Sequence, residues 1–108
     1  LLQFWSSLSM LHIVNKSPFE RPSLDACLRS AQSNDAVIFI EDGIIAATQG
    51  TVLSDKVENM LSSFKVYALK ADVDARGLSN KVIEGIEVIN YGQFVELVVE
   101  NGTPISWL

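Results

Sequence analysis

Four short segments rich in β-branched and aromatic residues alternate with segments of helical periodicity, and this alternation constrains the fold more than any other feature of the chain. The segments cover residues 11–14, 36–40, 65–69 and 86–89. Their length and composition predict four β-strands. The second segment, Ala-Val-Ile-Phe-Ile, is apolar at every position, which is typical of a strand covered on both faces. It therefore predicts a central strand of a parallel sheet.

Helical patterns lie between these strands. Apolar residues recur at helical spacing in two stripes, Leu24, Cys27, Leu28 and Ala31 in the first and Leu53, Val57, Met60, Leu61 and Phe64 in the second. Both stripes predict amphipathic helices, and Pro22 suits the first position of the first helix. Residues 43–49, closed by Gly50, and residues 71–76, closed by Gly77, predict two further short helices.

The C-terminal part of the chain predicts one more helix and one more strand. Phe94, Leu97 and Val98 follow helical spacing within residues 91–100, and this spacing favours a helix there. Residues 105–108 follow an Asn-Gly turn signal and predict a short edge strand.

This order of elements indicates an α/β fold. Strands that alternate with helices over short connections predict a single domain, with an open, mostly parallel sheet of four to five strands and helices on both faces. Ligands of such sheets gather at the carboxyl ends of the strands. We therefore expect functional groups at residues 15–20, 41–43, 70–74 and 90–92.

The length of 108 residues suits one domain, which we assign to residues 10–108. Residues 1–9 carry no charge, and they lack the basic start and the length of a signal peptide. We interpret them as a non-native or over-extended N-terminal segment, with the native chain starting at Met10. No apolar run approaches the roughly 20 residues that span a bilayer.

Charge and cysteine content exclude several classes of function. Eight basic residues against thirteen acidic ones give a net charge of −5, so the chain has no cationic field with which to bind nucleic acid directly. A single Cys and a single His allow neither an internal disulfide nor a multi-cysteine zinc site. A lone thiol suits a reducing compartment, and we expect a cytoplasmic protein. No dinucleotide-binding, P-loop, zinc-protease or serine-hydrolase motif is present.

Cys27 is the only side chain that can act as a redox-active nucleophile. It lies about a turn and a half into the first predicted helix, where a thiolate could feel the helix dipole. The same helical stripe places Cys27 on the apolar face, and free cysteines are among the most often buried residues. The pattern therefore leaves two readings open, a reactive thiol and an inert core thiol.

Two further side chains, His12 and Trp107, are better candidates for structural roles than for chemical ones. His12 lies within a predicted strand beside Leu11 and Ile13, and a lone strand histidine is more often a hydrogen-bonded structural residue than a ligand. Trp107 lies beside the C-terminal residue, so its ring can dock under the sheet or into a neighbouring molecule.

Two acidic pairs lie at predicted strand ends. Glu41 and Asp42 could bind a metal or act as an acid/base pair, but the simpler prediction is that Asp42 is the N-cap of the helix that opens at Gly43. Asp72 and Asp74 are predicted to form a solvated helix face.

Residues 10–108 resemble the TusB/DsrH family of sulfur-relay proteins. Four segments carry the resemblance, and their order and spacing extend over nearly the whole chain. These segments are Met-Leu-His-Ile-Val-Asn-Lys-Ser-Pro-Phe-Glu at residues 10–20, Glu-Asp-Gly-Ile-Ile-Ala-Ala at residues 41–47, Val-Tyr-Ala-Leu at residues 66–69 with Asp72 and Ala-Arg-Gly-Leu at residues 75–78, and Tyr-Gly-Gln-Phe-Val at residues 91–95 with a Trp-Leu end.

The resemblance implies a subunit of a sulfurtransferase complex. In the family, such a subunit assembles with TusC/DsrF and TusD/DsrE subunits into a heterohexamer that passes sulfur as a cysteine persulfide. The sulfur serves either 2-thiolation of a tRNA wobble uridine or sulfur oxidation, with DsrC or TusE as an indirect partner, and no metal or organic cofactor is implied. The principal persulfide cysteine belongs to the TusD/DsrE subunit.

The resemblance favours a functional role for Cys27, because DsrH members carry a cysteine at this position of the first helix. This similarity favours the DsrH side of the family and implies persulfide carriage on Cys27, whereas the apolar face still favours an auxiliary subunit without its own chemistry. The alternative from a different class is a stand-alone α/β module that self-associates or binds a small ligand.

Overall fold

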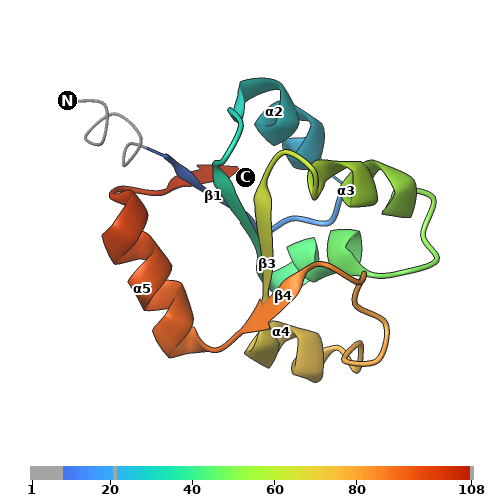
Figure 1. Ribbon diagram of the computed structural model, residues 1–108. Helices are drawn as coiled ribbons and strands as arrows, with labels where there is room; N and C mark the ends of the chain where they lie inside the picture. The colour runs from blue at the N-terminus through green and yellow to red at the C-terminus, as the bar shows by residue number, and fades with distance from the viewer. Residues whose placement is uncertain (1–8, 21, 108) are drawn as a thin grey trace.

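A computed structural model describes residues 9–20 and 22–107 of the chain (Figure 1). Five parallel strands form one sheet in the order β4-β3-β2-β1-β5. The strands are β1 (Leu11–Val14), β2 (Ala36–Phe39), β3 (Lys65–Leu69), β4 (Glu87–Ile89) and β5 (Ile105–Trp107). The predicted α/β fold with a parallel sheet is therefore confirmed, including the short edge strand at the C-terminal end.

Within the described residues, five helices connect or cover the strands. They are α2 (Ser23–Ser30), the 3-10 helix η1 (Glu41–Ala47), α3 (Ser54–Met60), α4 (Lys70–Ala75) and α5 (Tyr91–Asn101). In Figure 1, α2, α3 and α4 lie on one side of the sheet and α5 lies on the other. The prediction of helices on both faces is therefore confirmed, although the two faces are covered very unequally.

The larger core fills the face beneath α2, η1, α3 and α4. Its side chains come from alternate strand positions, such as Val37 and Phe39 of β2, and from the apolar stripes of the helices. All four residues of β2 are buried, because this strand is paired on both sides and covered on both faces. The uninterrupted apolar run in the sequence therefore marks the centre of the sheet, as predicted.

The smaller core lies beneath α5. Leu11, Ala36, Ile38, Leu69 and Ile89 form its buried part, and Phe94, Leu97 and Val98 of α5 pack against it. Asn90 caps α5 with a capping box, in which its side chain accepts from the Gln93 N–H while the Gln93 side chain accepts from the Asn90 N–H. The predicted spacing of apolar residues thus identified the inner side of this helix.

Several element boundaries differ from the predictions. Pro22 is the N-cap of α2 and lies one residue before the helix. The predicted helix at residues 43–49 begins two residues earlier, as the 3-10 helix η1, and the second amphipathic helix ends at Met60. The interpretation of residues 1–9 as non-native concerns a segment of which only Ser9 lies within the described residues, and it stays a prediction.

Candidate functional site

Cys27 is fully buried on the inner face of α2. Its exposed fraction is 0%, and the thiol belongs to the larger core. Burial raises the pKa of this thiol from 9.0 to about 12, and the negative charge of Asp35 contributes in the same direction. At neutral pH the side chain is therefore a neutral thiol, which is a poor nucleophile. In this conformation no persulfide donor can reach the sulfur atom.

Asp35, which precedes β2, receives three hydrogen bonds. The Met10 N–H donates to Oδ1 at 3.1 Å, the Gln32 N–H donates to Oδ2 at 3.0 Å, and Nε2 of His12 lies 2.9 Å from Oδ2. Burial alone would raise the pKa of Asp35, but these hydrogen bonds outweigh it and lower the pKa below 3.8. The carboxylate therefore stays charged inside the domain.

His12 and Trp107 complete this buried network. Nε1 of Trp107 donates to Nδ1 of His12 at 3.1 Å, and the two rings stack with centroids 6.1 Å apart. An Nδ1 atom that accepts a hydrogen bond carries no proton, so the His12 proton resides on Nε2 and points to Asp35. The prediction of a hydrogen-bonded structural histidine is confirmed. Trp107 packs against the larger core of its own chain.

Of the two acidic pairs at the strand ends, Asp42 and Asp72 hold η1 against α4, whereas Asp74 pairs with Lys70 of its own helix. The Glu41 N–H donates to Asp72 Oδ2 at 2.8 Å, and Arg76 donates to Asp42 Oδ1 at 3.0 Å. Asp42 makes no cap hydrogen bond, and the N-cap of η1 is Ile40, so the predicted capping role of Asp42 is wrong. Asp72 is half-buried and tied to Glu41, so it belongs to a contact between elements rather than to a solvated face.

A depression lies on the α5 side of the sheet. Two hollows of about 180 and 200 Å³ lie there, and Tyr67 of β3, Leu97 and Glu100 line both of them. We call this feature the Tyr67 groove, and we define it by Lys65, Tyr67, Glu87, Glu96, Leu97 and Glu100.

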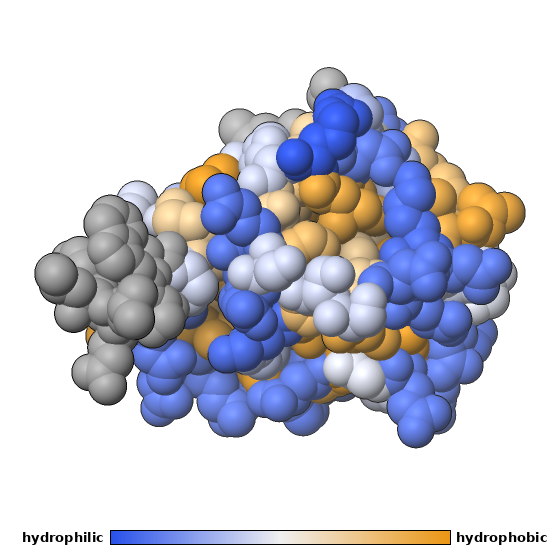
Figure 2. Space-filling model, turned by 45° about the horizontal axis from the view of Figure 1, so that its top comes forward, coloured by the Kyte–Doolittle hydropathy of each residue, from blue (hydrophilic) through white to orange (hydrophobic). Residues whose placement is uncertain are grey.

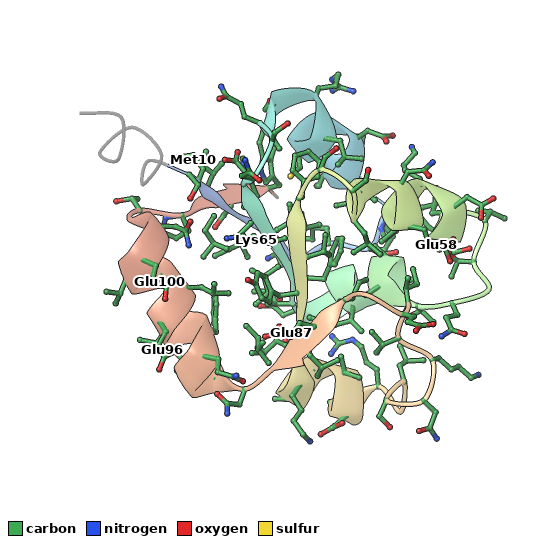
Figure 3. All side chains as sticks on the ribbon, viewed as in Figure 1. Met10, Glu58, Lys65, Glu87, Glu96 and Glu100 are labelled. Carbon is green, nitrogen blue, oxygen red and sulfur yellow. The ribbon has the colours of Figure 1, made fainter. Side chains whose placement is uncertain are left out.

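The Tyr67 groove has carboxylates on both sides. Figure 3 places Glu96 and Glu100 on α5 across from Glu87 on β4 and Lys65 on β3. Burial raises the pKa of the Tyr67 phenol, and the charges of Glu87 and Glu100 raise it further. This groove was not predicted from the sequence. The four-residue spacing of Glu96 and Glu100 was the only signal in the sequence. The other residues of the groove come together only in the folded chain.

Within residues 9–20 and 22–107, no three His, Cys, Asp or Glu side chains gather closely enough to hold a metal ion. Within the same residues, no helix has the length and apolar character needed to cross a bilayer.

Comparison with solved structures gives the same fold. The ychN protein from E. coli matches with a TM-score of 0.75 at 17% identity, over 91% of this chain and 98% of that protein. MTH1491 from Methanobacterium thermoautotrophicum, described as a protein of unknown function, matches with a TM-score of 0.70 at 17% identity, over 91% of this chain and 96% of that protein.

Comparison of sequences identifies the family. A family model described as "DsrH like protein" matches residues 16–103. Protein TusB of Pectobacterium parmentieri is 35% identical and Protein TusB of Enterobacter sp. (strain 638) is 36% identical. Each of these matches covers 91% of this chain and 100% of the relative. The chain therefore belongs to the DsrH-like family, as the resemblance in its sequence predicted.

Proposed function

We propose that this chain is a cytoplasmic subunit of a sulfur-relay complex of the TusBCD/DsrEFH type. Membership of the DsrH-like family supports a role for this chain in a sulfur-relay complex in general. The observation that carries the proposal is the similarity to Protein TusB over the whole length of those relatives. The proposed partners are TusC/DsrF-like and TusD/DsrE-like subunits, which exchange sulfur with a TusE/DsrC-like acceptor. The sulfur serves tRNA wobble uridine 2-thiolation or sulfur oxidation.

Within the complex we assign this chain an auxiliary role. A sulfur carrier needs a thiolate that attacks the outer sulfur of a donor persulfide, so that the donor S–S bond breaks, the donor leaves as a thiolate and a new S–S bond forms. The sulfur atom must also be accessible to the donor. In this conformation Cys27 offers neither an accessible sulfur atom nor a thiolate, because its thiol is buried and its pKa is raised to about 12. Persulfide carriage on Cys27 stays a prediction that requires α2 to move.

The native mass of this chain, co-expressed with TusC-like and TusD-like chains from the same genome, tests the proposal. We expect a discrete hetero-oligomer that contains all three chains. A homo-oligomer that leaves both partners behind would contradict the proposal and favour the stand-alone module.

The same complex tests persulfide carriage on Cys27. After incubation with a persulfide donor, intact mass spectrometry reads the mass of this chain, with Cys27→Ser as the control. An auxiliary subunit keeps its mass. A gain of one sulfur atom in the wild type that is absent from the variant would show that Cys27 carries sulfur.

A further inference from the structure

The edge strand β5 is attached to the domain mainly through one side chain. In the part of the chain that the structure describes, β5 pairs with β1 alone and forms the edge of the sheet (Figure 1). Ile105 and Ser106 are exposed, whereas Trp107 packs against the larger core. The indole ring of Trp107 is therefore the principal side-chain contact between β5 and the rest of the domain.

The indole ring is held by His12 of β1, which lies on the same face of the sheet. Trp107 pairs with Val14, two residues beyond His12, so the two rings meet diagonally across neighbouring strands. Nε1 of Trp107 donates to Nδ1 of His12 at 3.1 Å, and the imidazole is buried. An indole nitrogen can donate but not accept. This hydrogen bond therefore exists only while Nδ1 carries no proton.

A second proton on His12 would affect its two hydrogen bonds unequally. Nε2 already carries a proton that points to Oδ2 of Asp35 at 2.9 Å, so protonation of the ring turns this contact into an ion pair without breaking it. At Nδ1 the new proton would face the indole N–H, and two donors cannot form a hydrogen bond. The contact with Trp107 is therefore the one that must break.

Asp35 is the charged group that faces His12 among the described residues of the neighbouring elements. The strand residues paired with His12, Val37 of β2 and Ile105 of β5, are apolar. Helix α2 packs across β1 and β5, its charged residues are exposed, and its one buried titratable side chain is the neutral thiol of Cys27. The glutamates of α5 lie on the opposite side of the sheet (Figure 1). A proton on Nδ1 is therefore the change in charge that acts on the indole ring.

We propose that His12 is a pH-sensitive switch that controls the attachment of β5. As the pH falls from about 8 to about 5, the range in which histidine gains its second proton, Trp107 leaves the core and β5 separates from β1, while β1 to β4 stay folded. The open state holds one more proton than the closed state, so acid favours opening. This inference goes beyond the proposed function and does not depend on it.

Opening would change the surface of the domain at this edge. The main-chain groups of β1 that pair with β5 would become free, and a free strand edge can pair with a strand of another molecule. Departure of the indole ring would also bring part of the larger core into contact with water. Hydrophilic residues cover most of the face shown in Figure 2, so a newly exposed apolar area would be a distinct binding feature of the acid form.

NMR of the untagged full chain tests the switch directly, because His12 is its only histidine. The chemical shifts of the two imidazole nitrogens report when Nδ1 gains a proton, and the Nε1–H resonance of Trp107, identified with a Trp5→Phe variant, reports the hydrogen bond. We expect both signals to change with the same midpoint between about pH 8 and pH 5. An indole resonance that stays constant while Nδ1 gains its proton would overturn the proposal, as would an Nδ1 that gains no proton in this range.

Amide hydrogen exchange measures the separation of β5 from β1. After correction for the intrinsic pH dependence of exchange, we expect the protection of the amides that pair these strands to fall about tenfold over the same pH range, as for the loss of one hydrogen bond. Protection of β2 and β3 should stay constant. Trp107→Phe is the matched control, because it keeps an aromatic ring and removes the N–H donor, so its protection should be equal at the two ends of the range. An equal fall in this variant would assign the effect to another group and overturn the proposal.

Discussion

At Cys27, burial and the negative charge of Asp35 both raise the pKa of the thiol. Loss of water around the sulfur atom and the nearby Asp35 carboxylate both oppose formation of the thiolate. A rise in pKa from 9.0 to about 12 reduces the thiolate fraction near neutral pH by about a thousandfold. Any chemistry at this residue therefore begins with a change in the position of α2 that returns the thiol to water.

This property predicts the alkylation rate of Cys27. In the isolated native chain we expect iodoacetamide to react at least about a hundredfold more slowly than in the urea-unfolded chain, because the reagent requires an accessible thiolate. Mass spectrometry of timed samples gives both rates, and Cys27→Ser supplies the blank. Equal rates in the two states would show that the thiol is exposed in the native domain.

At the scale of the elements, η1 approaches β1 so closely that only glycine fits at the contact. A Cβ atom added at Gly43 would lie 2.1 Å from the carbonyl oxygen of Val14, which is far inside van der Waals contact. The Ile40 N–H donates to the same oxygen at 3.1 Å. The backbone at the end of β1 therefore has no freedom to move away from a larger residue.

Gly43→Ala should accordingly destabilise the domain. We expect the free energy of unfolding to fall by about 1–3 kcal/mol, because η1 must shift to admit the methyl group. Gly92→Ala is the matched control, since its nearest neighbour would be the Asn90 side chain at 3.4 Å and alanine favours the helix by up to about 1 kcal/mol. Urea titration followed by circular dichroism measures both variants, and an equal loss in both would contradict the steric argument.

The sequence predicted most elements because their signals are local. Strand composition and helical spacing depend on neighbouring residues, and they correctly identified β1, β3 and α5. The role of Asp42 was missed because its partner, Arg76, lies 34 positions away. The Tyr67 groove was missed for the same reason, since β3, β4 and α5 meet there only through the topology of the sheet.

At the scale of the whole molecule, two buried groups contribute to the pH dependence of stability. The pKa of Asp35 is lowered in the folded state from 3.8, so its contribution is present above pH 3.8 and is lost as the pH falls through the folded value. The pKa of Cys27 is raised from 9.0 to about 12, so its contribution is present below pH 9.0 and is lost as the pH rises toward 12.

Asp35→Asn tests the acid side of this range. We expect the variant to lose about 2–3 kcal/mol of unfolding free energy at pH 7, because charge-assisted hydrogen bonds from Met10, Gln32 and His12 are weakened. Its stability should then change less with pH below 4 than that of the wild type. Urea titrations at several pH values measure both effects. Parallel pH profiles for the two proteins would show that Asp35 does not control acid unfolding.

The pairing of β5 with β1 also has a consequence for the order in which the sheet forms. Trp107 and His12 lie 95 positions apart in the chain, whereas β1 and β2, and β2 and β3, are joined by single crossovers of modest length. Closing the long loop from an open chain costs entropy that the local pairs do not require. Once β1 to β4 have assembled, most of that separation is already bridged by folded structure. We therefore expect β5 to dock last and to detach first when the domain unfolds.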